Sequence, residues 1–377
     1  MNDQGYYIDD YYDVVIVGAG PAGLGIGIIL QQLGIYYVIL EKSSVGASFR
    51  KWPKETRFIS PSFTGNFFKM PDLNAITPNT SPAFELLTEH PTGNEYANHL
   101  QSLSKYFHLA IDTNVEVKNI ENKTDSFIVK TNNETYGCKI VIWAAGEYQY
   151  PKKKSFDGDH QCTHYSEVSS FSAVKGKESV VIGAYESGFD AAVNLVNVGK
   201  RVTLIDDSEY LDLVKSDSSY SLSPYTRDRI KGVLDNIAYH KKTRVEKVEF
   251  DNGKYIITTY NGKTFSSEDK PINCTGFSTS LKLVRGLFHF KRGYPLLTDC
   301  DESRKTNNLF LVGPQVKHGD ALFCFIYKYR QRFAIVAEKI AERLKTPRKE
   351  IEEVISSYKN NNFYLDDLDC CDDECVC

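Results

Sequence analysis

The stretch that most constrains the fold is residues 13–41, DVVIVGAGPAGLGIGIILQQLGIYYVILE. It has the pattern of a short buried strand, a glycine-rich turn, an apolar helix, a second apolar strand and a final acidic residue. Glycines at G-x-G-x-x-G spacing, placed between a strand and a helix and followed by such an acid, are typical of a dinucleotide-binding βαβ unit. The sequence therefore predicts a dinucleotide site here, and a packing helix that is merely rich in glycine is the alternative.

Each glycine of that pattern has its own physical task. Gly18 permits the tight turn, Gly20 lets the backbone approach a pyrophosphate, and Gly23 lets the helix pack closely on the strand. The first turn of the helix supplies N–H donors and a favourable dipole for the phosphates. Glu41 ends the second strand, where its carboxylate can accept hydrogen bonds from the ribose hydroxyls.

The same pattern occurs again at residues 178–207, ESVVIGAYESGFDAAVNLVNVGKRVTLIDD. Gly183 and Gly188 repeat the spacing of the first and third glycines of the opening turn. Asp206 stands at the same distance beyond the turn as the acid of the first copy. Two copies with matching internal spacing are stronger evidence than either alone, so the chain is predicted to contain two nucleotide-binding units.

The second copy departs from the first at Tyr185, which replaces the middle glycine. A tyrosine side chain would crowd a tightly bound pyrophosphate, so we expect the second nucleotide to bind more loosely or on a shifted backbone. A unit that has lost its ligand is the alternative. Asp206 and Asp207 would accept from a free 2′-hydroxyl and repel a 2′-phosphate, which favours NADH over NADPH.

The remaining sequence repeats this organisation. Alternating strand-rich segments follow each unit, at residues 114–143 and 243–269, and end in small residues at Ala144–Gly146 and Cys274–Gly276. We therefore predict an α/β fold with two Rossmann-like three-layer domains, each with an inserted β-meander. The predicted boundaries are 1–163 plus 285–365 for the first domain, 164–284 for the second, and 366–377 for an acidic cysteine-rich tail.

The last third of the chain returns to the first domain. A buried strand ends at Gly313, and apolar residues at helical spacing then predict one long helix from Asp320 to residue 344. Cys324 would face the apolar stripe of this helix and belong to the core. Arg330 and Arg332, with Lys328, are expected on a solvated face.

Bulk properties narrow the function classes. The net charge of −4 gives no reason to expect nucleic acid or an anionic membrane as a partner. The acidic start MNDQGYYIDDYYD does not resemble a signal peptide, and Val14–Leu30 contains five glycines and a proline, which suits a buried nucleotide unit better than a membrane span. We expect a cytoplasmic protein that acts on a small-molecule substrate; homo-oligomer formation stays open.

Nine cysteines, an odd number, argue against a disulfide scaffold and for a reducing compartment. Metal binding is not expected, except that the tail offers a thiol cluster that could carry electrons or bind a soft metal ion. The acidic residues around these thiols would raise the thiol pKa, which would make the thiols poor nucleophiles. A disordered tail without such a role is the alternative. The tail cysteines are Cys370, Cys371, Cys375 and Cys377.

The assembled pattern resembles flavoproteins with two dinucleotide-binding domains. The resemblance rests on GAGPAG, Glu41, VGASFRKWP, WAAG, GAYESG, CTGF, FLVGPQ and FCFIYKYRQRF, and it covers roughly residues 12–345. The most similar groups are bacterial flavin-containing monooxygenases and flavoproteins similar to bacillithiol-disulfide reductase and thioredoxin reductase. The resemblance implies FAD on the first unit and NADPH or NADH on the second.

The resemblance also implies roles for individual residues. Trp52 and the Gly46 loop would lie beside the isoalloxazine ring, and the helix after His318 would direct its positive end at the flavin. The implied cofactor residues are Gly18, Gly20, Pro21, Ala22, Gly23, Glu41, Lys42, Gly46, Trp52, Ala145, Gly146, Gly183, Glu186, Ser187, Gly188, Asp206, Gly276, Gly313, Pro314 and Gln315.

This chain also departs from those families. The Cys-x-x-Cys of thioredoxin reductases is absent, and the late flavin strand has Gly313-Pro314 in place of Gly-Asp. The monooxygenase fingerprint F-x-G-x-x-x-H is partial, because Cys162 stands where the histidine belongs. Candidates for a catalytic role are His164, Cys274 and Tyr329, although a buried strand residue is the simpler interpretation of Cys274.

Three functions remain. We favour a monooxygenase, in which oxygen reacts with the reduced flavin in a water-poor pocket and no cysteine pair is needed. A low-molecular-weight disulfide reductase is the close alternative. A redox-sensing flavoprotein that recruits a partner is the third, and nothing in the sequence specifically favours it.

Overall fold

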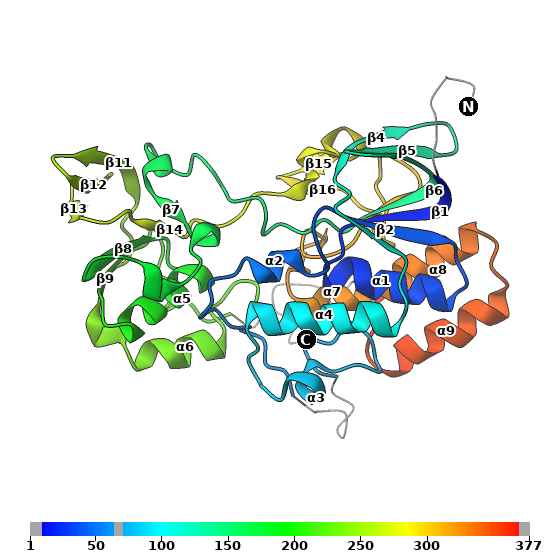
Figure 1. Ribbon diagram of the computed structural model, residues 1–377, viewed down its shortest axis with the longest axis horizontal. Coiled ribbons are helices and arrows are strands. Elements are labelled where there is room, and N and C mark those ends of the chain that lie inside the picture. Colours follow the sequence, from blue (N-terminus) through cyan, green and yellow to red (C-terminus); the bar gives the residue numbers. More distant parts are fainter. Residues whose placement is uncertain (1–9, 64–70, 216, 369–377) are drawn as a thin grey trace.

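The computed structural model describes residues 10–63, 71–215 and 217–368 and contains two lobes, each built on its own sheet (Figure 1). The first sheet has the strand order β3-β2-β1-β6-β5-β4, and β17 pairs with the far side of β6. Strands β1, β2, β3, β6 and β17 run parallel, whereas β4 and β5 form an antiparallel meander with the first half of β6. The bounds are β1 Asp10–Val17, β2 Tyr37–Glu41, β3 Ile111–Thr113, β4 Val117–Asn122, β5 Phe127–Thr131, β6 Thr135–Trp143 and β17 Leu309–Leu311.

Helices cover this sheet because the strands that run between parallel neighbours are apolar on both faces. The four last residues of β1 are fully buried, and α1 is buried over ten of its twelve residues. Residues from the end of the chain complete this layer, since α8 packs against α1 and α9 against α8 (Figure 1). The helices are α1 Pro21–Gln32, α2 Ala47–Arg50, α3 Pro82–Leu86, α4 Gly93–Tyr106, α8 Phe333–Arg343 and α9 Arg348–Asn360.

The second lobe repeats this plan on a smaller scale. Its parallel sheet has the order β10-β9-β8-β14-β7, and a separate three-stranded antiparallel sheet, β11-β12-β13, forms its meander. The bounds are β7 Thr163–His164, β8 Glu178–Ile182, α5 Glu186–Asn197, β9 Arg201–Ile205, α6 Pro224–Lys231, β10 Ile237–His240, β11 Val245–Asp251, β12 Lys254–Thr259, β13 Thr264–Ser267 and β14 Ile272–Asn273. The predicted fold class, two Rossmann-like dinucleotide-binding domains, is therefore correct.

The two glycine turns match in atomic detail. Gly18 has φ +106° and Gly183 has φ +95°, which residues with a side chain rarely adopt. A Cβ on Gly23 would lie 1.8 Å from the Gly18 carbonyl oxygen, and a Cβ on Gly188 would lie 1.8 Å from that of Gly183. Each helix therefore packs on its strand at a distance that only glycine permits.

The prediction of one long helix from Asp320 is wrong. Lys317–His318 (β18) and Ala321–Leu322 (β19) form a two-stranded hairpin, and Gly319 in its turn has φ +53°. The helical segment begins only at α7, Ile326–Tyr329, and continues through a 3-10 turn, Arg330–Arg332, into α8. Apolar spacing alone missed this hairpin, because its residues also fit a helical period.

The expectation that Arg330 and Arg332 lie on a solvated face is also wrong. Arg332 is fully buried and binds both carboxylate oxygens of Asp301 at 3.0 Å, while His318 Nε2 lies 2.5 Å from the same carboxylate. Arg330 is buried over the Phe363 ring and donates to the Ala75 carbonyl oxygen at 2.7 Å. These partners lie far away in the sequence, so the side chains hold the hairpin and the chain end rather than face water.

No helix in the described part of the chain is long and apolar enough to cross a membrane.

Candidate active site

A cavity of about 430 Å³ begins at the glycine turn of the first domain, follows the carboxyl ends of β1 and β6, and reaches the start of α5 in the second. Ligands of open α/β sheets bind at this position, beyond the carboxyl ends of the strands. The predicted cofactor and catalytic residues on its wall are Gly18, Gly20, Pro21, Ala22, Glu41, Lys42, Gly46, Trp52, Ala145, Gly146, Glu186, Ser187, Pro314 and Tyr329.

The turn of the first domain fits a dinucleotide. Gly20 caps α1 in an extended conformation, and a Cβ placed on it would meet no heavy atom within 4 Å. Space is thus left free at the point where a pyrophosphate must approach the helix N-terminus. Glu41 is fixed by the backbone, since its carboxylate accepts from the Ala19 N–H at 2.8 Å and from the Ser43 N–H at 2.9 Å. These residues would hold the pyrophosphate and the adenosine ribose of FAD.

Aromatic side chains dominate the far end of the cavity. Trp52 lies with its ring centroid 5.0 Å from that of Phe58, and both pack with Phe49. Tyr148 and Phe277 stack at 4.9 Å on the side nearer the second domain. A planar ring would therefore find mainly aromatic surface at this end of the cavity.

Cys324 also lies on the wall, which the sequence did not predict. We expected this residue in the core of a long helix, but the hairpin before α7 turns it toward the cavity, where its Sγ lies 3.2 Å from Ser219 Oγ. Burial raises the pKa of its thiol, so the thiolate is disfavoured at neutral pH. Of the cysteines that the structure describes, no other lines the cavity, and all five are free thiols.

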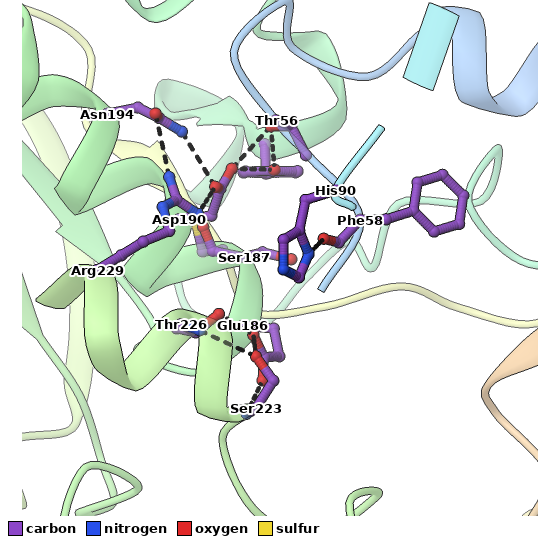
Figure 2. A network of polar contacts seen from close by, with 12 residues as sticks. Thr56, Phe58, His90, Glu186, Ser187, Asp190, Asn194, Ser223, Thr226 and Arg229 are labelled. Carbon is purple, nitrogen blue, oxygen red and sulfur yellow. Dashed lines mark hydrogen bonds and ion pairs between the residues drawn. The ribbon is translucent and has the colours of Figure 1, made fainter. Parts of the chain in front are cut away.

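A buried polar network joins the two domains beside the cavity (Figure 2). Asp190 of α5 accepts hydrogen bonds from Thr56 and Tyr165, both at 2.7 Å, on one carboxylate oxygen. Arg229 at 2.7 Å and Asn194 at 3.0 Å bind the other oxygen. Burial, followed by the nearby charge of Asp190, raises the Tyr165 pKa well above its usual value. Because Thr56 belongs to the first domain, the network fixes how the two domains meet.

Glu186 reaches the cavity from the first turn of α5, but its carboxylate is occupied. It accepts from the Ser223 N–H at 2.5 Å and from Thr226 Oγ1 at 2.6 Å, and so ties α5 to the start of α6 (Figure 2). Burial raises its pKa, and these hydrogen bonds act in the opposite direction. Ser187, the next residue, lies on the wall as predicted.

The glycine turn of the second domain is covered by the chain itself. Tyr185 caps α5 at the position that Gly20 has in the first domain, and its hydroxyl donates to the carbonyl oxygens of Ser219 and Ser221 at 3.2 and 3.0 Å. Its ring lies 4.7 Å from the ring of Tyr210. The Tyr185 side chain and residues 219–221 therefore lie beside the start of α5, where a second pyrophosphate would approach.

Asp206 repeats the role of Glu41 toward the backbone but is more deeply buried. Its carboxylate accepts from the Ala184 N–H at 3.3 Å, and Tyr239 OH lies 3.4 Å away. Burial raises its pKa to about 6. Asp206, Gly183 and Gly188 do not line the cavity, so the structure brings only Glu186 and Ser187 of the predicted second-nucleotide residues to its wall.

The other predicted residues lie behind the wall. Gly23 packs α1 on β1, and Gly313, with φ +115°, lies against Ala22. Gln315 accepts from Ser280 Oγ at 3.0 Å, and the Gly276 carbonyl oxygen lies 3.0 Å from His164 Nε2.

His164 and Cys274, the two catalytic candidates in the second domain, also lie behind the cavity wall. Burial lowers the His164 pKa, and Cys274 is buried with a thiol pKa raised well above its usual value. Neither side chain lines the cavity, whereas Tyr329 does. No cluster of metal-ligating side chains occurs within the described ranges, and the tail cysteines lie outside them.

Comparison with known proteins shows the family. The sequence profile of the pyridine nucleotide-disulphide oxidoreductases matches residues 15–313. The chain belongs to that family. It is 25% identical over 348 residues to bacilliredoxin reductase Bdr of Bacillus subtilis, an alignment that covers 87% of this chain and 97% of the relative.

Solved structures of this fold include both kinds of relative that the sequence resembles. The bacillithiol disulfide reductase Bdr (YpdA) from Staphylococcus aureus matches with a TM-score of 0.73 at 18% identity, over 89% of this chain and 99% of that one. A flavin-containing monooxygenase from Stenotrophomonas maltophilia matches with a TM-score of 0.70 at 18% identity, with the same coverage. The chain is thus a member of a family of flavin-dependent pyridine nucleotide oxidoreductases, which contains relatives with different reactions.

Proposed function

We propose that this protein is an FAD- and NAD(P)H-dependent monooxygenase that acts on a small substrate. FAD would accept a hydride from the nicotinamide and pass two electrons on. The observation that carries the reaction type is the lining of the cavity, which is rich in aromatic side chains and includes a single described thiol, Cys324. Burial keeps this thiol protonated and it has no described cysteine partner, so the wall suits oxygen chemistry better than thiol exchange.

Asp206 and Asp207 support NADH as the preferred donor. Both carboxylates follow β9, at the position that recognises the adenosine ribose in this fold. A 2′-phosphate there would be repelled by the exposed carboxylate of Asp207, with the buried Asp206 behind it, whereas a free hydroxyl can donate to Asp207. NADH is expected to reduce the flavin faster than NADPH.

A disulfide reductase is the second candidate, and two observations favour it. Cys324 lies on the cavity wall, where its sulfur could attack a small disulfide, forming a mixed disulfide and releasing one small thiol. The relative named bacilliredoxin reductase also aligns over 87% of this chain.

The two functions are separated by what oxidises the reduced protein. The flavin is first reduced anaerobically with NADH, and the return of its absorbance is then followed after mixing with oxygen or with a low-molecular-weight disulfide. The monooxygenase proposal expects oxygen to be effective and label from isotopic oxygen to enter an organic product. Rapid reoxidation by disulfide alone contradicts it.

Cys324→Ser supplies the matched test. The replacement puts a hydroxyl of similar size in place of the thiol, and this hydroxyl can still hydrogen-bond with Ser219. A monooxygenase retains its turnover in this variant, whereas a reductase that uses the thiol loses nearly all disulfide-dependent turnover. Cys300→Ser is the control, because this half-buried thiol lies away from the cavity wall.

A further inference from the structure

Each turnover of the proposed reaction needs a proton from outside the reactants. The C–H bond of NADH breaks and the hydride carries one hydrogen and two electrons to the acceptor. When oxygen is the acceptor, the O–O bond breaks, one oxygen atom enters the substrate, and the other leaves as water with the hydride hydrogen and one added proton. Reduction of a disulfide to two thiols likewise takes one added proton. A group in the cavity must therefore deliver a proton.

Glu147 is placed to do this. It directly follows Gly146 at the carboxyl end of β6, and its side chain lines the cavity with Tyr329 and Cys324. Burial raises the pKa of both of these groups, and the charge of Glu147 adds a smaller increase, so Glu147 lies within electrostatic reach of each. Burial raises the pKa of the Glu147 carboxyl to about 7, and no hydrogen bond to it from another described residue contributes.

The other described carboxyl groups on the cavity wall accept hydrogen bonds or form ion pairs. Glu41 accepts from two backbone N–H groups, and Glu116 forms an ion pair with Lys42 at 2.9 Å and another with Lys118. Glu186 is bound by Ser223 and Thr226, and Asp190 by four side chains. These four carboxylates are already engaged as hydrogen-bond or ion-pair acceptors, and such contacts favour the charged form. Burial still raises the pKa of Glu186, but its carboxylate is held by Ser223 and Thr226, whereas Glu147 has no such described donor.

The remaining titratable groups on the wall release a proton less readily than a carboxylic acid. Burial raises the pKa of Tyr148, Tyr150 and Tyr329, and that of the Cys324 thiol. The cationic side chains on the wall are Lys42, Lys51 and Arg57, and no histidine is among the described lining residues.

We propose that Glu147 is the proton donor of this cavity. Its carboxyl O–H bond breaks as the acceptor is reduced, and the carboxylate then takes a proton from water. The assignment rests on the proposed hydride transfer to a second acceptor, and it holds for oxygen and for a disulfide alike. The titratable groups that share the cavity wall with Glu147 are Cys324 before α7, Tyr329 at the end of α7, Tyr148 and Tyr150 in the loop of Glu147, and Glu186 and Asp190 of α5.

The test compares the holoprotein with its Glu147→Gln variant, which keeps the side-chain shape and removes the acid. Reoxidation of the reduced flavin is expected to slow by about 10²-fold at neutral pH, whereas reduction by NADH changes little. The wild-type rate is expected to fall as the pH rises through about 7, because the carboxyl loses its proton. The variant loses this pH dependence. Glu353→Gln on the exposed face of α9 is the control.

A direct readout does not depend on turnover. Infrared difference spectra, wild type minus Glu147→Gln, should contain the carbonyl stretch of a protonated carboxyl near neutral pH, and this band should vanish at higher pH. The proposal is overturned if the band is absent at neutral pH, or if reoxidation and its pH profile are the same in both proteins. A wild type that neither NADH nor NADPH reduces refutes the proposed function instead, and the infrared band still reports on Glu147.

Discussion

Two glycines of the first turn should respond in opposite ways to the same substitution. Gly20→Ala and Gly23→Ala each add one methyl group, three residues apart on the same turn. A Cβ on Gly20 meets nothing within 4 Å, whereas a Cβ on Gly23 would lie 1.8 Å from the Gly18 carbonyl oxygen. We expect the first variant to lose cofactor affinity and the second to lose stability.

The magnitude for Gly23→Ala follows from that distance. A carbon atom needs more than about 3 Å from a carbonyl oxygen, so α1 must retreat from β1 by more than about 1 Å. Ile16 and the other three residues at the carboxyl end of β1 are buried beneath the helix, which leaves this part of the strand no room to yield. Overpacking of this kind costs about 1–3 kcal/mol, and more where neighbours cannot move.

Gly20→Ala should leave the fold intact. Gly20 has φ −86°, which any residue adopts, so the added methyl introduces no backbone strain. The methyl would project into the space that the pyrophosphate needs, and a loss of about 2 kcal/mol in binding corresponds to roughly 30-fold weaker FAD affinity.

The assay is carried out on the flavin-free proteins. Urea unfolding measures stability, and quenching of flavin fluorescence on titration with FAD measures affinity. The reasoning is refuted if Gly20→Ala binds FAD as tightly as the wild type, or if Gly23→Ala unfolds at the wild-type urea concentration. The exposed Ser356→Ala on α9 is the control, and it should change neither stability nor FAD affinity.

Two further predictions concern the second domain. Tyr185→Gly removes the hydroxyl that donates to Ser219 and Ser221 and opens the start of α5. NADH should therefore bind roughly tenfold more tightly, as measured by a fluorescence titration. Weaker binding would show instead that the tyrosine itself holds the dinucleotide. Asp206→Asn tests the buried carboxyl: its pKa is raised to about 6 in the folded protein, so the wild type loses stability as the pH rises through that value. The variant should therefore melt roughly 2–5 °C higher than the wild type near pH 8, with no such gain near pH 4, and equal differences at both pH values would contradict this.

The sequence predicted the repeated part of the fold well, because local patterns specify it. Gly18 and Gly183 with their following helices, the buried strands and the acids Glu41 and Asp206 all occur at the expected places. Within such a unit, the conformation of each glycine depends on residues a few positions away or on the adjacent strand. Sequence spacing therefore carries the information.

Predictions failed where contacts between distant segments decide the structure. The residues around Cys324 have helical apolar spacing, but a hairpin turn at Gly319 interrupts it and directs the thiol to the cavity. Arg332 has the spacing of a solvated residue and is buried only because Asp301 lies opposite it. Glu147 could have been noticed, since it directly follows Gly146 at a strand end, but nothing local indicated that it would lack a partner.

The sequence by itself thus determined two nucleotide-binding units and placed the intact glycine turn in the first, because these features depend on backbone geometry over short spans. Only the tertiary structure decided that the second turn is covered by Tyr185 and residues 219–221, and that Glu147 shares a cavity wall with Cys324 and Tyr329. The physical reason is that accessibility and proton affinity depend on everything packed around a group. That environment is assembled from segments up to hundreds of residues apart.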